Sequence, residues 1–380
     1  MSTIYLENRY QISSEALKQI SQAENIPYVN EVEESLAGAL KFAWQWLQGN
    51  TTFEQATSGS TGSPKKISIH RDQMIASAQM TIQALGLTQS DSSLLCLSAQ
   101  YIGGKMMVVR SLLSDMDLII VRPNSSPLLY LPFLPTFASL VPLQIQKLLE
   151  RKASSQLNRM KAIIIGGAPV NTLLEEQIAN NLTVPVYSTY GMTETVSHIA
   201  LRKLTPPNDS TYFEVLGNTQ IMTDERGCLK IKGRVTQEKW LTTNDLVEIK
   251  NDYQFRWLGR YDSIINSGGV KVSPEAIEKV LELILRQKNF LGRFLVSSLP
   301  DEKLGERVVL LLEGNSFPND LENAFLKDAA EQLSPYQVPK AIYYLPHFAE
   351  TPTGKVQRDE SRTLLIQLLT ASDQRVEKFS

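Results

Sequence analysis

The chain has 380 residues, of which 42% are hydrophobic and 21% are charged, enough for a buried core and more than one domain. Its 38 lysines and arginines nearly balance its 40 aspartates and glutamates, so its charge does not favour nucleic acid or a membrane surface. No apolar run is long enough to span a bilayer, and the opening residues lack the apolar centre of a signal peptide. Cys96 and Cys228 suggest neither a disulfide framework nor, with the histidines, a zinc site. A soluble cytoplasmic enzyme is expected.

The first part of the chain alternates predicted strands with predicted helices. Residues 53–69 are expected to form a strand, a glycine-rich loop and a second strand. A helix is expected from about Asp72, because apolar residues recur at helical spacing until Gly86. The elements expected next are a strand at 94–97, a helix at 106–113, a strand at 161–165, a helix opened by Pro169 and a strand at 184–187. This alternation predicts an α/β fold with a parallel or mixed sheet.

From Phe213 the pattern changes to short strands separated by turns, which indicates a small β-rich subdomain. After Arg260 a separate α+β domain is expected. Its predicted elements are helices at 274–284 and 321–333 and strands at 294–298, 307–313 and 341–344. We therefore expect a large N-terminal domain over residues 1–260 and a smaller, mobile C-terminal domain over residues 261–380.

The strongest local signal is a loop rich in serine, threonine and glycine. It consists of Thr57, Ser58, Gly59, Ser60, Thr61, Gly62, Ser63, Pro64 and Lys65. Its hydroxyls and backbone N–H groups carry little bulk, and Lys65 adds a positive charge, so the loop suits a polyphosphate. The spacing is not that of a Walker A loop. Taken alone, the same composition also fits a flexible linker.

A second motif, YSTYGMTET, starts at the end of the strand predicted at 184–187. The carboxyl end of a strand is the usual ligand-binding edge of an α/β sheet. There Tyr190 is suited to stack on a base, Thr193 to donate to a phosphate and Glu194 to hold Mg²⁺. In isolation the segment also fits an ordinary turn with exposed polar residues.

Four further motifs, each weak alone, are TNDL at 243–246, GRYD at 259–262, SGGVK at 267–271 and PTGKV at 352–356. Asp245 is suited to accept both ribose hydroxyls, and Arg260 can bind ribose or phosphate oxygens. The paired glycines allow another chain or a thin ligand to pass close to the backbone. The alternatives are turns, a surface ion pair and, for the last motif, an exposed lysine.

Together these segments resemble the ANL superfamily of adenylate-forming enzymes, which includes acyl-CoA synthetases, adenylation domains and luciferases. The motifs that carry the resemblance are TSGSTGSPK, GGAP at 166–169, YGMTET, TNDL, GRYD, SGGVKVSPEAIE and PTGKVQRD, in family order over residues 53–362. Asn244 departs from the family, which usually has glycine there. The phosphate loop also comes early, so residues 1–52 are expected to supply only a remnant of the usual N-terminal lobe. A homodimer is expected to cover apolar surface left by that loss.

The resemblance implies that the protein uses ATP, Mg²⁺, coenzyme A and a carboxylic acid. It implies that residues 57–65 hold the β- and γ-phosphates, that Thr193 contacts the α-phosphate and that Glu194 binds Mg²⁺. Around the nucleoside it implies that Gly167 and Ala168 line the adenine and that Tyr190 and Gly191 lie against it. It further implies that Asp245 and Arg260 hold the ribose. For the C-terminal domain it implies that Lys355 bridges the α-phosphate and the attacking carboxylate, Asp262 is the hinge, and Gly268 and Gly269 line the path of the pantetheine. Lys355, Thr193 and Glu194 would be the catalytic residues.

The stretch 98–111 bears on the acid, because Arg110 ends an apolar run there. An arginine in apolar surroundings needs an anionic partner, which could be a structural carboxylate, unless its side chain extends to solvent. The layout resembles the 2-succinylbenzoate–CoA ligases of menaquinone biosynthesis, whose substrate has two carboxylates. That resemblance implies that Arg110 binds the carboxylate that is not activated, and that Ser197 and His198 line the same pocket.

Three alternatives stay open. They are another aryl- or fatty-acyl-CoA ligase, an adenylation enzyme that loads a carrier protein, and a non-catalytic nucleotide-binding relative. An aminoacyl enzyme would carry an acidic residue near the pocket entrance for the amine, and none can be placed there. Retention of Lys65, Glu194 and Lys355 argues against the non-catalytic relative, because a binder would not need the catalytic lysine.

Overall fold

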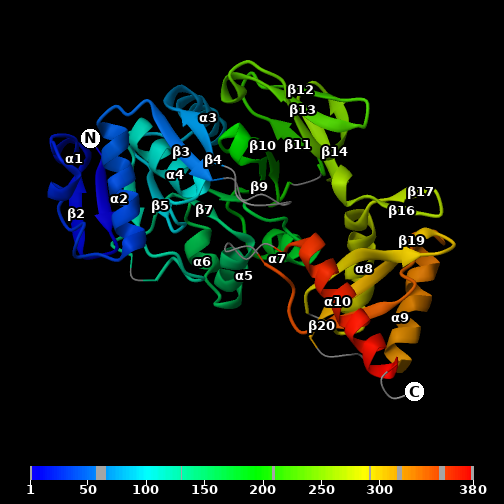
Figure 1. The fold of residues 1–380 in the computed structure, drawn as a ribbon. Helices are drawn as coiled ribbons and strands as arrows, with labels where there is room; N and C mark the ends of the chain where they lie inside the picture. The colour runs from blue at the N-terminus through cyan, green and yellow to red at the C-terminus, as the bar shows by residue number, and fades with distance from the viewer. Residues whose placement is uncertain are drawn as a thin grey trace.

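The structure is a computed structural model that describes residues 2–56, 66–129, 131–207, 210–290, 292–314, 319–350 and 356–377 (Figure 1). Within these ranges the largest element is a thirteen-stranded sheet in the order β12-β13-β14-β15-β11-β10-β9-β8-β7-β5-β6-β1-β2. Its strands are β1 (Thr3–Leu6), β2 (Tyr10–Ser13), β5 (Ser92–Leu95), β6 (Asp117–Ile120), β7 (Phe137–Leu140), β8 (Ala162–Ile165), β9 (Val186–Gly191), β10 (His198–Lys203), β11 (Phe213–Val215), β12 (Gln220–Thr223), β13 (Cys228–Lys232), β14 (Leu241–Asn251) and β15 (Gln254–Arg260). The stretch from β1 to β9 in this order is parallel, and the pairs at both ends are antiparallel. The predicted α/β class is confirmed.

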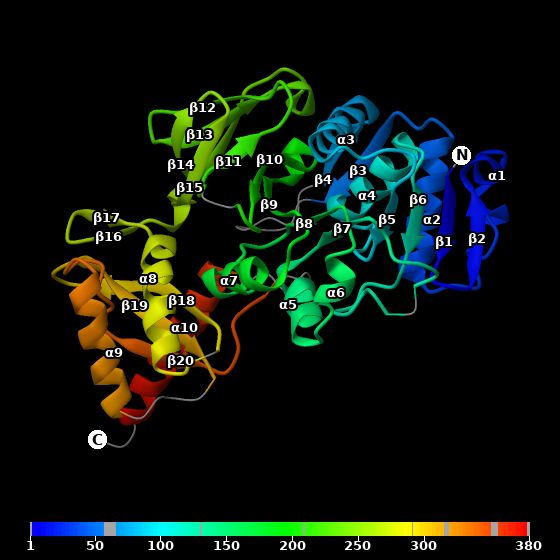
Figure 2. The ribbon, with the colours of Figure 1, turned by 180° about the vertical axis from the view of Figure 1, so that it is seen from behind.

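Helices cover both faces of the parallel strands (Figures 1 and 2). One face carries α2 (Glu34–Leu47), α3 (Arg71–Leu85) and α4 (Ile102–Leu113), and the other carries α5 (Pro142–Glu150), α6 (Ser154–Leu157) and α7 (Thr172–Asn181). Successive strand residues alternate between the two cores: Leu95 and Ile164 join the first, and Leu94 and Ile163 join the second. Because both faces are covered, these strands are continuously apolar.

The first residues complete one edge of the sheet. β1 pairs in parallel with β6, Ile4 standing opposite Leu118, and β2 pairs outside it before the short helix α1 (Ser14–Lys18). α2 buries Leu40 and Trp46 in the core that also holds Met106 of α4. The expected remnant is therefore a packed layer, and this chain itself covers apolar surface of α4. The homodimer stays a prediction.

Several boundaries predicted from the sequence differ from the structure by a few residues, and for two of them the structure shows the reason. The helix predicted from Pro169 begins at Thr172, because the side chain of Asn171 accepts the N–H of Leu174 and caps the helix there. The strand predicted at 184–187 continues as β9 to Gly191, because β10 pairs with it that far. The expected β-rich region is present, and β11 to β15 continue the large sheet through β10.

A second sheet follows the 3₁₀ turn η4 (Tyr261–Ser263), in the order β17-β16-β19-β18 with β20 on β19. Its elements are β16 (Ile265–Ser267), β17 (Val270–Val272), α8 (Pro274–Gln287), β18 (Phe294–Asp301), β19 (Gly305–Glu313), α9 (Asn319–Gln332), β20 (Ile342–Leu345) and α10 (Arg358–Glu377). Leu281, Leu310 and Phe325 lie at its core. We call β16–β20 with α8–α10 the five-stranded unit. None of the helices in the described ranges is long and apolar enough to cross a membrane.

The five-stranded unit contacts α7, a helix on one face of the large sheet, through Glu282 of α8. The Glu282 carboxylate accepts the backbone N–H groups of Thr172 at 3.2 Å and Leu173 at 3.4 Å. These donors lie in the first turn of α7, where no partner exists within the helix. Arg286 donates to Glu282 and lies 3.4 Å from Glu176. Because α7 closely follows the GGAP motif, the contact links the five-stranded unit to the segment expected to line adenine.

Candidate active site

Tyr190 and Asp245 come from different motifs and meet in the structure. Tyr190 lies near the end of β9, and its hydroxyl donates to Asp245 Oδ2 over 2.6 Å. Trp257 of β15 donates its indole N–H to Asp245 Oδ1 over 3.2 Å. Alternation along β14 buries Thr243 with Asp245, and the Thr243 hydroxyl accepts the Asp245 backbone N–H. Burial, and next the charge of Asp245, raise the pKa of Tyr190, so its hydroxyl remains a donor.

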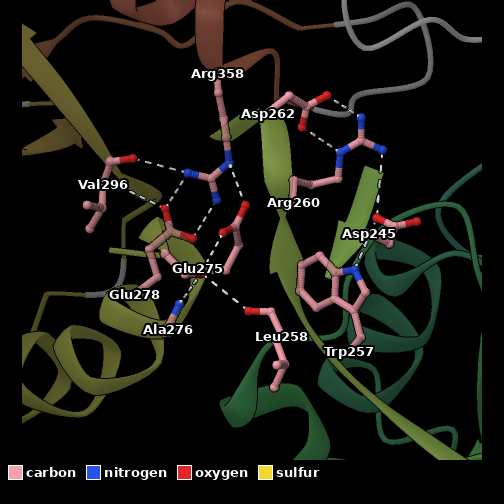
Figure 3. Close-up of polar contacts among 11 residues, drawn as sticks. Asp245, Trp257, Leu258, Arg260, Asp262, Glu275, Ala276, Glu278, Val296 and Arg358 are labelled. Carbon is pink, nitrogen blue, oxygen red and sulfur yellow. Dashed lines mark hydrogen bonds and ion pairs between the residues drawn. The ribbon is translucent and has the colours of Figure 1, made fainter. Parts of the chain in front are cut away.

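Arg260 faces the same carboxylate from the neighbouring strand. It stands opposite Asp245 in the pairing of β15 with β14, with Nη1 3.7 Å from Asp245 Oδ1. Its guanidinium forks onto Asp262, with Nε 2.9 Å from Oδ1 and Nη2 2.6 Å from Oδ2 (Figure 3). Burial alone would raise the pKa of Asp262, but the hydrogen bond and the charge of Arg260 lower it below its usual range.

The four residues Tyr190, Asp245, Arg260 and Asp262 are called the nucleotide corner below. Asn244, which departs from the family pattern, donates to Asp262 over 3.4 Å and so adds to this group. The structure thus joins a residue expected to hold the ribose to the residue expected to be the hinge. A rotation about Asp262 would therefore move the carboxylate that the Arg260 guanidinium binds.

The residues expected around adenine lie at the carboxyl ends of two neighbouring parallel strands. Gly167 and Ala168 are exposed just after β8, and Tyr190 lies near the end of β9 beside it. Gly167 has a φ of +84°, in the left-handed region that favours glycine. A Cβ on Gly191 would lie 2.3 Å from the carbonyl oxygen of Ser197, so only glycine fits there. This edge is where α/β sheets bind ligands.

The 3₁₀ turn η2 (Thr193–Thr195) carries the candidates for the phosphate and the metal. The Thr195 hydroxyl accepts the N–H of Met192 over 3.0 Å and so fixes the turn. In this turn Glu194 is exposed to solvent and Thr193 is half-buried. Their hard oxygen donors fit Mg²⁺.

Arg110, Ser197 and His198, which were predicted to share a pocket, are in contact. Arg110 is 1% exposed within α4, and its Nη2 donates to the Ser197 hydroxyl over 2.8 Å. Ser197 Oγ lies 3.4 Å from His198 Nδ1, and His198 Nε2 lies 2.9 Å from the hydroxyl of Thr81 on α3. We call Arg110, Ser197 and His198 the acid corner.

Arg110 is a buried cation without a counter-charge in the part of the chain that the structure describes. Its Nε has no hydrogen-bond partner there, and neither a structural carboxylate nor extension to solvent accounts for it. Burial lowers the pKa of Arg110 to about 9, so it stays charged at neutral pH. Burial, and next the charge of Arg110, lower the pKa of His198, which is therefore neutral. An unpaired buried charge is costly, and this one indicates an anionic ligand.

Residues 33–224 match the family described as AMP-binding enzyme. The chain belongs to this family. The resemblance to the ANL superfamily is thereby confirmed, and this AMP-binding enzyme is an adenylate-forming ligase of the acid–thiol class.

Curated relatives and solved structures agree with this membership. A 2-succinylbenzoate–CoA ligase of Bacillus cytotoxicus is 26% identical over 343 aligned positions, which cover 81% of this chain and 69% of the relative. A ligase of the same name from Listeria innocua is 24% identical and covers 94% of this chain and 82% of the relative. An acyl-CoA synthetase (AMP-forming)/AMP-acid ligase II-like protein from Dyadobacter fermentans is 39% identical with a TM-score of 0.60, covering 94% of this chain and 99% of that one.

A further structural neighbour is the O-succinylbenzoate coenzyme A synthetase of Bacillus subtilis, solved in complex with ATP and magnesium ion. Its TM-score is 0.68 at 23% identity, over 81% of this chain and 69% of that chain. At this identity the likeness is one of fold.

The phosphate loop Thr57–Lys65 and the catalytic candidate Lys355 lie outside the described residues. The strands that flank the loop, β3 (Thr52–Ala56) and β4 (Lys66–His70), pair antiparallel as far as Ala56 opposite Lys66. The predicted strands on both sides of the loop are therefore confirmed.

Arg358, three residues after Lys355 in the sequence, anchors α10 on α8 (Figure 3). Its Nη1 donates to Glu278 Oε1 over 2.7 Å, and its Nε lies 3.9 Å from Glu275 Oε1. The Ser273 hydroxyl lies 2.9 Å from Glu275 Oε2 and 3.3 Å from a backbone carbonyl of β15. Contacts therefore run from α10 to the strand that ends at the nucleotide corner.

Gly268 and Gly269 form the turn between β16 and β17, away from the end of β9 in this arrangement (Figures 1 and 2). Their φ angles of +60° and +83° suit a tight hairpin turn. A Cβ on Gly268 would lie 2.8 Å from the ring of Tyr336, whereas a Cβ on Gly269 would meet nothing within 4 Å. The structure does not join these glycines to the nucleotide corner.

Sequence reasoning missed Thr81, Trp257 and Glu282. Thr81 lies on the buried face of α3 with Met74 and Ala78, and a polar residue at that spacing is a signal that could have found it. Trp257 lies on the same strand as Arg260, and nothing in the sequence around it indicates that it donates to Asp245. Glu282 binds the backbone of another helix, which no motif reveals.

Proposed function

We propose that this AMP-binding enzyme is an ATP-dependent acid–CoA ligase whose acid is 2-succinylbenzoate, acting in menaquinone biosynthesis in the cytoplasm. The observation that carries the proposal is the buried Arg110, which lacks a carboxylate partner among the described residues. The acid has two carboxylates, so one can be activated while the other neutralises Arg110. The names of the curated relatives support the same acid.

In the first half-reaction an acid oxygen attacks the α-phosphorus of ATP, and pyrophosphate leaves. The carboxylate is a weak nucleophile that approaches a triphosphate of like charge. Lys355 offsets that repulsion, and Thr193 donates to the α-phosphate as charge develops there. The loop 57–65 holds the β- and γ-phosphates. Mg²⁺, held by Glu194 when bound, supplies further positive charge at the phosphate oxygens.

The nucleotide corner binds the ribose and the base. The two oxygens of Asp245 offer about four lone-pair sites, of which Tyr190 and Trp257 use two. The remaining sites can accept both ribose hydroxyls, with Arg260 beside them. The Tyr190 ring, fixed by its hydroxyl, supports the adenine between Gly167, Ala168 and Gly191.

In the second half-reaction the thiol of coenzyme A attacks the acyl-adenylate carbonyl, the thioester forms and AMP leaves. We propose that residues 261–380 turn about Asp262 between the half-reactions. The turn withdraws Lys355 and brings Gly268 and Gly269 to the pantetheine path. One site requires such a rearrangement because the two steps need different groups at the same place.

Replacement of Gly269 tests this second step. Gly269→Leu should block thioester formation and spare ATP–pyrophosphate exchange, because its side chain would fill the pantetheine path. Gly269→Ala is the matched control, since it introduces the same strain at positive φ with little bulk. Normal thioester formation by Gly269→Leu would contradict the placement.

The proposal as a whole is tested by ATP–pyrophosphate exchange with 2-succinylbenzoate, benzoate and octanoate. We expect exchange to depend on 2-succinylbenzoate, and thioester formation to follow when free coenzyme A is added. Preference for octanoate or benzoate would indicate another acyl-CoA ligase, and exchange without transfer to free coenzyme A would indicate a carrier-loading enzyme. Nucleotide binding without exchange would indicate a non-catalytic relative.

Sedimentation velocity at micromolar concentration tests the proposed homodimer.

A further inference from the structure

Thr81 lies at the far end of a hydrogen-bond chain that leads to Arg110. It is fully buried inside α3. Its hydroxyl oxygen lies 2.9 Å from His198 Nε2 and 3.3 Å from the carbonyl oxygen of Ser77. On the other side of the imidazole, His198 Nδ1 lies 3.4 Å from Ser197 Oγ, which accepts from Arg110 Nη2 over 2.8 Å.

The chemistry of the end groups fixes the direction of each hydrogen bond. A guanidinium only donates, so Ser197 Oγ accepts from Arg110 and its own hydrogen points to His198 Nδ1. A neutral imidazole that accepts at Nδ1 carries its hydrogen on Nε2, which then donates to Thr81 Oγ1. The Thr81 hydrogen is left for the Ser77 carbonyl. Each hydrogen bond along the path from Arg110 to Ser77 then has one donor and one acceptor.

Other states of His198 do not fit. An Nδ1–H tautomer or an imidazolium would direct an N–H at Ser197 Oγ. The Ser197 hydrogen would then have no acceptor among the residues that link Arg110 to Ser77. An imidazolium would also place a second cation beside Arg110. The lowered pKa of His198 agrees with the neutral form.

We propose that Thr81 is a positioning residue for selection of the acid. Its hydroxyl holds His198 as the Nε2–H tautomer, and this tautomer, through Ser197, fixes the orientation of the Arg110 guanidinium. Because Ser197 engages Nη2, the remaining donors of the Arg110 guanidinium, among them the Nε–H that has no partner in the described ranges, are left for the ligand's second carboxylate. The identity of that ligand rests on the proposed function, whereas the tautomer does not.

A purely structural role is the alternative. Threonine in a helix often returns its hydroxyl to the carbonyl four residues earlier, as Thr81 does to Ser77, and this needs no further partner. That alternative predicts that loss of the hydroxyl changes stability and leaves the ranking of acids unchanged.

The tautomer can be read in the wild-type protein, and a variant is needed only to assign the signal. Protein labelled with ¹⁵N-histidine should show the Nε2–H pattern for His198 in two-bond ¹⁵N–¹H correlation spectra, the signal being assigned by its loss in His198→Gln. An Nδ1–H or imidazolium pattern at pH 7.5 would overturn the proposal.

Substitutions test the link to acid selection. Thr81→Val should lower the ratio of kcat/KM for 2-succinylbenzoate over that for benzoate about 3- to 10-fold, mainly through the KM of the acid. It should also shift the His198 signal, and Thr81→Ser, which keeps the hydroxyl, should restore both. Thr219→Val is the matched control, because Thr219 is another buried threonine whose hydroxyl meets Met80 of α3.

The outcomes separate the two proposals. If Thr81→Val and Thr219→Val behave alike, Thr81 is structural and the inference fails. If wild-type protein prefers benzoate while His198 keeps the Nε2–H pattern, the proposed function fails and the assignment of the tautomer is supported.

Discussion

The nucleotide corner and the acid corner each place an arginine beside polar side chains, but among the described residues only the first provides a carboxylate that pairs with it. The side chain of Arg260 is 32% exposed and binds Asp262, with Asp245 beyond it. Arg110 is 1% exposed and meets a serine hydroxyl but no carboxylate within the described ranges. In the first corner the arginine is paired before a ligand arrives, whereas in the second the arginine becomes paired only when an anion binds.

This difference separates two kinds of binding energy. A ligand in the nucleotide corner adds hydrogen bonds to groups that are already paired, so a lost contact there should cost little and affect every acid alike. A ligand in the acid corner relieves an unpaired, desolvated charge, so a lost contact there should cost more. Selection among acids should therefore depend on the acid corner.

The largest effect is expected from Arg110→Ala. With 2-succinylbenzoate, kcat/KM should fall about 30- to several thousand-fold, because truncating one partner of a buried charge pair costs roughly 2–5 kcal/mol. Wild-type protein should use benzoate poorly, and the substitution should lower that activity far less. Steady-state pyrophosphate exchange with both acids measures the two effects.

Arg110→Lys is the matched control for this prediction. It keeps the positive charge but loses the planar fork, so it should recover only part of the activity. Equal losses on both acids, together with a lower melting temperature, would show that Arg110 is structural. The comparison between the corners would then fail, and a generic acyl-CoA ligase would remain.

Lys355→Ala should lower the rate of adenylation by a factor on the order of 10²–10³, which is typical of a lost electrostatic group at the transition state. Thioester formation from pre-made acyl-adenylate should stay largely intact. In contrast to Arg110→Ala, the loss should be the same for every acid. Equal damage to both half-reactions would argue against rotation of residues 261–380.

A smaller effect is expected from Asp245→Asn, which tests the nucleotide corner. The KM for ATP should rise about tenfold, because the amide nitrogen cannot accept from Trp257, Tyr190 or the ribose. Exchange assays at varied ATP should show the same rise with each acid. A change confined to 2-succinylbenzoate would break the comparison between the corners.

The smallest effect concerns stability against pH. The pKa of His198 is lowered in the folded protein, whereas in the unfolded chain it is about 6.5. Below pH 6.5 the unfolded chain therefore binds a proton that the folded protein does not, and stability falls by up to about 1.4 kcal/mol per pH unit. This contribution is complete above pH 6.5 and is lost as the pH falls toward the pKa of the folded state.

Urea unfolding at pH 7.5 and 5.5 checks this sign. His198→Gln should remove about 1 kcal/mol of the wild-type loss between the two pH values. His347→Gln is the control, because the His347 side chain is 89% exposed. Identical losses in wild-type protein and His198→Gln would show that His198 is not held neutral.

The sequence was sufficient to predict part of the binding edge, because Tyr190 lies near the end of one strand and Gly167 lies just after the end of its neighbour. Parallel pairing brings the carboxyl ends of neighbouring strands to one edge, so Tyr190 and Gly167 are expected to be near each other once both strands are recognised. Asp245 lies 55 residues beyond Tyr190, and the family order of the motifs, not any local pattern, predicted that they would meet.

All three residues of the acid corner were predicted, but the contact of His198 with Thr81 was not, because that contact is tertiary. Thr81 and His198 lie 117 residues apart, one in a helix and one in a strand, and neither segment marks its partner. Similarly, the extension of β9 to Gly191 depends on pairing with β10, which strand propensity in the segment itself does not reveal.

Because of the Glu282 contact, hydrogen exchange at the start of α7 can report on movement of the five-stranded unit. Two amide groups in the first turn of α7 are hydrogen-bonded to a carboxylate that belongs to the five-stranded unit. If that unit rotates between the half-reactions, these amides become exposed to water, and their hydrogens exchange with deuterium faster. Exchange at Thr172 and Leu173, followed with ATP and acid present and then with coenzyme A added, would time the rotation without a label on either domain.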